Sequence, residues 1–216
     1  IMILTWFGQS YFKIETQNKV IAIDPYNESS TGLKPSRFKA DILLITHNHD
    51  DHNNAKLILG DPFVMDTPGE IEIDGIFIQG IEAYHDNKNG VQLGKSTIFV
   101  IKTEDLILVH LGDLGEKKLR EEIIETLGAV DILLIPTGGV YTINAEEAIT
   151  ITNQIEPNIV IPMHYKLPGL KINLDPVDKF LKEYGVKPEQ QEKLVIRKSN
   201  LPSEKEETKV IILQNQ

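Results

Sequence analysis

The sequence at residues 46–53 is THNHDDHN, and it directly follows the apolar run DILLI at residues 41–45. A continuous apolar run such as residues 41–46 (DILLIT) is typical of a strand that is buried on both faces. The chain must leave the sheet after Thr46, because NHDDHNN is too polar to stay in an apolar layer. We therefore expect a polar loop at the end of a buried strand.

Three histidines fall within six residues of this loop, in the pattern His-x-His-x-Asp-His. Residues two apart in an extended loop project to the same side, so His47 and His49 can bind one metal ion. If the chain then turns into a helix at the two aspartates, Asp51 and His52 project toward a neighbouring position. The spacing in this loop therefore predicts a site for two cations that lie close together. Asp50 is an alternative to Asp51, although the acid adjacent to the last histidine fits the spacing better.

One loop cannot hold two cations, so further ligands must come from elsewhere in the chain. Three polar residues each stand just past an apolar run: His85 in AYHDN, Asp113 in HLGDLG and His164 in IPMHYK. In open α/β sheets, binding groups gather in loops at strand ends. The chain has no cysteine, and imidazole with carboxylate suits zinc, manganese or iron. We predict two divalent metal ions, with Zn²⁺ favoured over Mn²⁺ or Fe²⁺.

The composition is that of a globular protein, with 41% hydrophobic residues in 216 and a net charge of −10. This length predicts a single domain over residues 1–216. The negative charge works against loose binding to nucleic acid, although a bound metal pair can reverse the field inside a cleft. We find no signal peptide and no apolar run long enough for a membrane span, which favours a cytoplasmic protein.

The hydrophobic pattern changes from strands in the first third to alternating strands and helices. We expect strands at 2–6, 11–15, 20–24, 41–46, 63–65, 75–80, 97–102, 106–110, 131–136 and 158–162. We expect helices at 116–127, 144–154 and 175–184. A closing pair of strands, 193–197 and 209–213, flanks the polar segment SNLPSEKEE (199–207). This order predicts an α/β fold of two sheets with helices on the outer faces.

Several segments together carry a resemblance to a known family. They are TWFGQSYFKIE near the start, IDP at 23–25, THNHDDHN, YHD at 84–86, HLGDLG at 110–115, LLIPTGGVYTINAEEA at 133–148 and IPMHY at 161–165. On these segments, roughly residues 2–166, the chain resembles the metallo-β-lactamase superfamily. Within it, the chain is most similar to the branch of L-ascorbate-6-phosphate lactonases and related metal-dependent hydrolases.

The resemblance implies an αββα sandwich with a metal site at one edge of the paired sheets. It assigns one metal to His47, His49 and His85, and the other to Asp51, His52 and His164. It also implies that Asp113 bridges the two metals and that Asp24 supports the histidine loop from behind.

Other residues are candidates for supporting roles. His110 and Asp86 are candidates for supporting the ligands or contacting substrate, and a hydrogen-bonded core position is the alternative for His110. Four residues beside the expected site could contact an anionic group of the substrate, and ordinary loop or packing use is the alternative for each: Gly139, Tyr141, Tyr165 and Lys166.

This site predicts a hydrolase in which a hydroxide between two metals attacks a small ester, lactone or phosphodiester. Asp51 or Asp113 would move a proton to the leaving group. Alternatives are an RNA nuclease or a promiscuous β-lactam hydrolase on the same site, and a di-iron oxidoreductase is less favoured. We expect a small and anionic substrate, no membrane partner and no preference for nucleic acid, while self-association into a homo-oligomer stays open.

Overall fold

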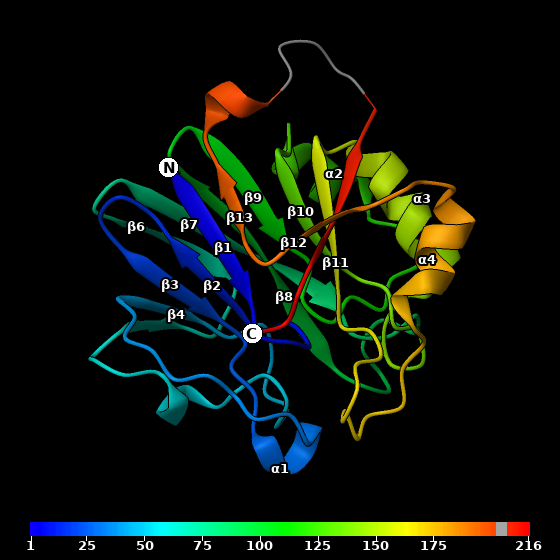
Figure 1. The fold of residues 1–216 in the computed structure, drawn as a ribbon, viewed down its shortest axis with the longest axis horizontal. Coiled ribbons are helices and arrows are strands. Elements are labelled where there is room, and N and C mark those ends of the chain that lie inside the picture. The colour runs from blue at the N-terminus through cyan, green and yellow to red at the C-terminus, as the bar shows by residue number, and fades with distance from the viewer. Residues whose placement is uncertain (202–206) are drawn as a thin grey trace.

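Two mixed β-sheets pack face to face in a computed structural model that describes residues 1–201 and 207–216 (Figure 1). The first sheet has the order β13-β1-β2-β3-β4-β5. Its strands are β1 (Met2–Trp6), β2 (Phe12–Glu15), β3 (Val20–Ile23), β4 (Ile42–Leu44), β5 (Phe63–Met65) and β13 (Leu194–Ile196). The pairs β3–β4 and β4–β5 are parallel, and the other pairs are antiparallel.

The second sheet has eight strands in the order β12-β14-β11-β10-β9-β8-β7-β6. They are β6 (Gly69–Ile73), β7 (Ile76–Tyr84), β8 (Lys95–Thr103), β9 (Leu106–His110), β10 (Ile132–Pro136), β11 (Ile159–Met163), β12 (Glu189–Gln191) and β14 (Lys209–Leu213). Strands β6 to β9 form an antiparallel meander, and β9, β10, β11, β14 and β12 run parallel.

Three helices lie together on the outer side of the second sheet (Figure 1). They are α2 (Glu121–Leu127), α3 (Ala145–Ile155) and α4 (Val177–Tyr184), while α1 (Glu28–Thr31) is a single turn beside the first sheet. Short 3₁₀ turns occur at Ala55–Leu57 and Lys198–Asn200. No helix in the described part of the chain has the length and apolar character needed to cross a membrane.

The central strands are apolar throughout because the second sheet is covered on both faces. In β10, Ile132 and Leu134 belong to the core between the two sheets, whereas Leu133 and Ile135 belong to the core beneath the helices. A strand buried on both faces needs no alternation of polar residues. The predicted fold class, a metallo-β-lactamase-type sandwich, is therefore confirmed in its two sheets and outer helices.

Strand direction places the polar loops at one edge of the sandwich. Strands β7, β9 and β11 of the second sheet point the same way, because β7 is two antiparallel steps from β9 and β9 is two parallel steps from β11. Their carboxyl ends lead directly to His85, Asp113 and His164. Strand β4 of the first sheet leads to the histidine loop.

The prediction that strands at 193–197 and 209–213 form a closing pair is wrong. Strand β13 is antiparallel to β1 in the first sheet, whereas β14 lies between β11 and β12 in the second sheet. Each strand fills a place in a different apolar layer, and this pairing depends on contacts far away in the sequence. Part of the polar segment predicted to join them lies outside the described residues.

Three local boundaries also differ from the sequence prediction. Residues 116–120 are not helical, because both backbone polar groups of Leu119 bond the Gln154 side chain. The segment 66–74 contains the edge strand β6, whose alternating GEIEI is mostly exposed. The expected helix at the two aspartates is only one turn, closed by the bonds from His52 N and Asn53 N to His49 O.

Two glycines let the loops close tightly behind the histidines at the sheet edge. A Cβ built on Gly138 would lie 2.1 Å from the carbonyl oxygen of His164. A Cβ on Gly115 would lie 2.4 Å from the carbonyl carbon of His85. Real Cβ atoms do not approach backbone so closely, so a side chain at either position must displace a histidine.

Replacing Gly138 with alanine should therefore destabilise the fold and displace His164. Overpacking of this kind costs about 1–3 kcal/mol, which corresponds to a fall in Tm of about 5 °C for a chain of this size. Gly185→Ala is the matched control, because a Cβ there meets nothing within 4 Å and its φ of +74° with ψ of +21° is a left-handed conformation that other residues also adopt. Calorimetry would contradict this account if Gly138→Ala lowered Tm no more than the control.

Candidate metal centre

The histidine loop and the end of β7 together form one group of possible ligands. Ligand atoms of His47, His49 and His85 all lie within 4.8 Å of one another. The Nε2 atom of His47 is 3.0 Å from Nδ1 of His49. The two-residue spacing thus brings both rings to the same side of the loop, as the sequence predicted, and the end of β7 adds the third ring.

A second group lies beside the first and comes from three separate segments. Ligand atoms of Asp51, His52, Asp113 and His164 also lie within 4.8 Å of one another. The Asp51 carboxylate, 20% exposed, is 3.5 Å from Nε2 of His52. Asp50 belongs to neither group, so the geometry favours Asp51 over the alternative that the spacing left open.

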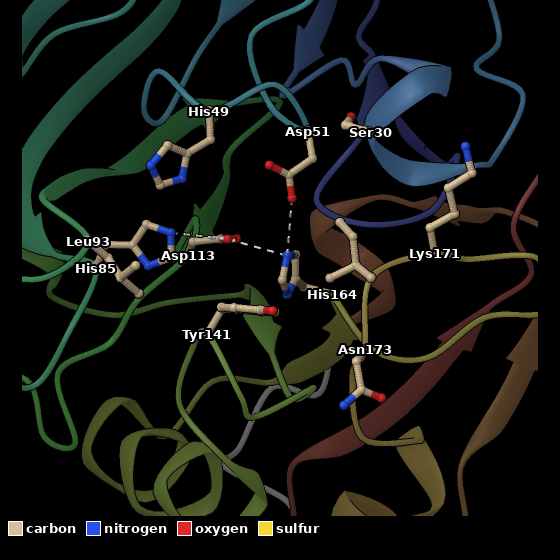
Figure 2. Close-up of a pocket in the computed structure, with 11 residues that line it drawn as sticks. Ser30, His49, Asp51, His85, Leu93, Asp113, Tyr141, His164, Lys171 and Asn173 are labelled. Atoms are coloured by element: carbon tan, nitrogen blue, oxygen red, sulfur yellow. Dashed lines mark ion pairs between the residues drawn. The ribbon is translucent and has the colours of Figure 1, made fainter.

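Asp113 connects the two groups. Its Oδ2 lies 3.2 Å from Nε2 of His52, 3.3 Å from Nε2 of His164 and 3.5 Å from Nε2 of His85. One carboxylate oxygen therefore faces histidines of both groups, which is the position expected of a bridging ligand. Figure 2 shows the ion pairs from Asp113 to His85 and to His164.

Asp24 is fully buried behind the loop and orients a histidine of each group. Its carboxylate accepts bonds from Thr46 N (2.8 Å) and Thr46 Oγ1 (2.6 Å), and Nδ1 of His52 is 2.9 Å away. Since Thr46 Oγ1 donates to Asp24, it accepts from Nδ1 of His47 at 2.9 Å. Both rings then carry a proton on Nδ1 and direct Nε2 at the site.

Several buried ring nitrogens in the two groups form no hydrogen bond. They are Nε2 of His52, Nδ1 of His85, and both ring nitrogens of His164. An unpaired buried polar atom costs about 1–3 kcal/mol, and a cation bound at Nε2 of His52 or at one ring nitrogen of His164 would remove that cost for the nitrogen it binds. Five imidazoles and two carboxylates also form a donor set that suits zinc or a similar divalent ion, so the residues fit a metal site.

The protonation of the site follows from burial and from the charges around it. Burial and the neighbouring His52 lower the pKa of His47 to about 2, so this ring is neutral. Burial also lowers the pKa of His85. For His52, burial opposes the charged form, but the surrounding carboxylates, with Asp113 foremost, raise its pKa well above the ordinary value. The metal-free site therefore holds its proton on His52.

Ser10 also fixes Asp113, and the sequence analysis did not identify it. Its hydroxyl donates to Oδ1 of Asp113 at 3.3 Å, which leaves Oδ2 for the histidines. His110 is buried in the core and holds this arrangement, because its Nε2 donates to Ser10 O and its Nδ1 accepts from Gly112 N. The predicted candidate His110 therefore has the hydrogen-bonded core position and supports Asp113 through Ser10 and through Gly112, the residue before Asp113.

Asp86, another predicted candidate, organises the loop that follows β7. Its carboxylate accepts bonds from four backbone amides, those of Lys88, Gly90, Gln92 and Leu93. These bonds lower the pKa of Asp86, with the Leu93 amide as the largest contributor. The loop then closes through the bond from His85 N to Gly94 O at 3.0 Å, which sets the backbone of His85.

A cavity of about 500 Å³ opens over the two groups. Its lining comprises Ser30, His49, Asp51, His85, Leu93, Asp113, Tyr141, His164, Lys171, Ile172 and Asn173 (Figure 2). Among the four residues predicted to contact substrate, Tyr141 lines this cavity and Gly139, Tyr165 and Lys166 do not. Tyr165 packs in the core against Trp6, with ring centroids 5.0 Å apart.

The wall of the cavity includes residues that the sequence analysis missed. Lys171, Ile172 and Asn173 come from the segment between β11 and α4, and Ser30 comes from α1. Lys166 instead donates to the carbonyls of Leu170 and Ile172 and so shapes this segment. No motif surrounds these wall residues, and only the three-dimensional contacts bring them to the cavity.

Comparison with known proteins gives a match over most of the chain. The sequence model of a family described as a beta-lactamase superfamily domain matches residues 3–164. A UPF0173 metal-dependent hydrolase from Salinibacter ruber is 31% identical over 216 aligned positions, covering 85% of this chain and 94% of the relative. One from Pyrococcus abyssi is 30% identical and covers 74% of this chain and 83% of the relative.

The structure of the chain is also similar to a solved structure. A crystal structure from Thermotoga maritima, of a proposed Zn-dependent hydrolase of the metallo-β-lactamase superfamily, superposes with a TM-score of 0.78 at 34% sequence identity. It covers 99% of this chain, and 98% of its own chain is matched. These three proteins are not named as L-ascorbate-6-phosphate lactonases, so that branch stays a prediction.

Asp24→Asn should weaken zinc binding by about 10–100-fold, the usual cost of losing a group that orients metal ligands. Asparagine keeps the size of the side chain and tolerates the positive φ of 50° at this position. It replaces one of the two acceptor oxygens with a donor, so the bonds to Thr46 and His52 cannot all form. Competition with a chromogenic chelator measures the affinity.

Asp74→Asn is the matched control, because Asp74 has nearly the same φ of 49° and lies in the exposed turn between β6 and β7. Its zinc affinity should equal that of the wild type. Equal affinity in the Asp24 and Asp74 variants would sink the orienting role of Asp24.

Zinc affinity should also fall as the pH is lowered. The raised pKa of His52 means that the metal-free site carries a proton, which a metal ion must displace from Nε2. The affinity therefore rises with pH, and we expect at least a tenfold gain between about pH 6 and about pH 8. The same chelator assay at the two pH values tests this, and an unchanged affinity would contradict the assignment of the proton.

Proposed function

The chain belongs to the beta-lactamase superfamily domain family, and from this premise we propose that it is a metal-dependent hydrolase with two divalent cations. One cation would be held by His47, His49 and His85. The other would be held by Asp51, His52 and His164, and Asp113 would bridge the two. The observation that carries the proposal is the position of Asp113 Oδ2, which faces histidines of both ligand groups.

The relatives support hydrolysis in preference to redox chemistry. The matched proteins from Salinibacter ruber and Pyrococcus abyssi are both named as metal-dependent hydrolases. Imidazole and carboxylate ligands suit iron as well as zinc, so this preference rests on the named relatives. A di-iron oxidoreductase is therefore not favoured for this chain.

When bound, a pair of divalent cations lowers the pKa of water and polarises the carbonyl or phosphoryl oxygen of a substrate. The protein residues then have separate tasks. Asp113 is 3% exposed and its Oδ1 is bonded to Ser10, so its task would be to hold and position the two metal ions. Asp51 is 20% exposed and lines the cavity, so it is the carboxylate that can carry a proton to a leaving group.

The cavity favours a small substrate. Its volume of about 500 Å³ lies within the range of about 300–1,000 Å³ typical of small-molecule sites. Leu93 and Ile172 present apolar surface beside the ligands, and the Tyr141 side chain lies between His85 and His164 in Figure 2. We propose a small ester, lactone or phosphodiester as substrate, and cleavage of RNA or β-lactams is the alternative that a substrate panel would detect.

Metal analysis of the purified protein and of two variants tests the proposed ligand groups. Zinc-loaded wild type should contain two ions per chain. His49→Ala should retain about one, because His49 belongs to only one group, whereas Asp113→Ala should lose most of both. A wild-type protein that binds one ion or none, after dialysis against excess zinc, contradicts the two-metal proposal.

The catalytic role of Asp51 is tested on a panel of lactones, aryl esters, phosphodiesters, RNA and β-lactams. For the best substrate, Asp51→Ala should lower kcat by about 10²–10⁴-fold. Asp50→Ala is the matched control, because it removes a neighbouring carboxylate that belongs to neither ligand group. Equal activity of the two variants would exclude Asp51 as the proton carrier and ligand.

A further inference from the structure

Lys171 stands on the cavity wall with its charge still available. Apart from the proposed ligands, it is the one charged side chain in the lining among the described residues. Figure 2 shows Lys171 and Asn173 on the side of the cavity opposite His85 and Leu93. The Lys171 ammonium points toward α1 in that view, so a group that it binds would be separated from His85 by the width of the cavity.

The ammonium group of Lys171 has no carboxylate partner within residues 1–201 and 207–216. Its one hydrogen bond goes to Ser29 O at the long distance of 3.4 Å. An ammonium has three donors, so at least two are left for a ligand. The side-chain amide of Asn173 likewise has no partner in the described part of the chain and can add a further donor.

The backbone of Lys171 is held firmly, and the same contacts tie it to the metal loop. Its backbone amide donates to Thr31 O at 2.8 Å. Its stem fills the space over Gly32, where a Cβ would lie 2.9 Å from Cγ of Lys171. Asn27, which directly precedes α1, donates its backbone amide to Asp50 O at 3.0 Å. The base of the lysine is therefore placed relative to Asp51.

The charge of the cavity also favours an anion. Two divalent cations would outweigh the charges of Asp51 and Asp113, and Lys171 would add to the excess. The chain as a whole carries a net charge of −10, so this cavity would be an isolated positive region on a negative protein. Such a positive region raises the local concentration of small anions.

We propose that Lys171, assisted by Asn173, forms an anion-binding subsite, so that the substrate carries a carboxylate or phosphate group apart from the bond that is cleaved. The proposal rests on the proposed function, since the metal pair would hold the other end of the substrate. Lys166, one of the residues that the sequence offered for such a contact, bonds two backbone carbonyls instead.

Equilibrium binding tests this subsite without relying on catalysis. The probes are succinate and phosphonopropionate, which carry an anion at both ends, and butyrate, which has the same length and one carboxylate. Isothermal titration of zinc-loaded wild type should show both two-ended anions binding about tenfold more tightly than butyrate, as expected for one charge-assisted contact.

Lys171→Gln should reduce this preference to within about twofold, while Lys171→Arg should keep it because the charge remains. Lys102→Gln is the charge-matched control. Lys102 pairs with Phe77 near the start of β7, whereas the site lies at the other end of that strand. A preference that survives in Lys171→Gln, or that is absent in wild type, overturns the subsite. Zinc content is measured first in each sample, so failure to hold metal counts against the proposed function and is distinguished from loss of the subsite.

Discussion

The site depends on one electrostatic constraint: lone pairs of five imidazoles and two carboxylates converge in a small, mostly buried space. The Oδ2 atom of Asp113 faces three Nε2 atoms at 3.2–3.5 Å, and several ring nitrogens nearby have no hydrogen bond. A cluster of acceptors with too few protons costs free energy, and bound cations convert that cost into affinity. The surrounding structure acts to keep these atoms in place: Asp24 and Ser10 hold the ligands from behind, and Gly138 lets the backbone close against His164.

The sequence was informative wherever a feature depends on neighbours in the chain. The spacing in residues 46–53 predicted that His47 and His49 share a side, and the helix expected at 144–154 is α3 (Ala145–Ile155). The positions of His85 and His164 could be predicted as strand-end polar residues, because parallel strands bring their carboxyl ends to one edge. The resemblance to a known family supplied the pairing of ligands into two groups, which spacing alone does not contain.

The sequence was uninformative where a residue is defined by distant contacts. Strands β13 and β14 belong to different sheets, and nothing in their local pattern distinguishes this from a hairpin. Ser10 is one small polar residue near the start of the chain, yet it bonds a carboxylate 103 positions away. Lys171 and Lys166 have the same charge and lie five positions apart, and only the fold shows that one lines the cavity while the other bonds backbone carbonyls.

The two sides of the cavity are built differently, and this separates chemistry from specificity. The metal side is formed by loops at the ends of strands that are paired with a neighbour on both sides. The opposite wall is formed by α1 and the segment before α4, which are short and irregular. A fold does not determine its substrate, and here the irregular wall is where a different substrate preference could arise. Even so, the bonds from Asn27 and Ser30 to Asp50 O tie that wall to the metal loop. The wall is therefore preorganised relative to Asp51, and the base of Lys171 is held at a fixed place relative to the ligands.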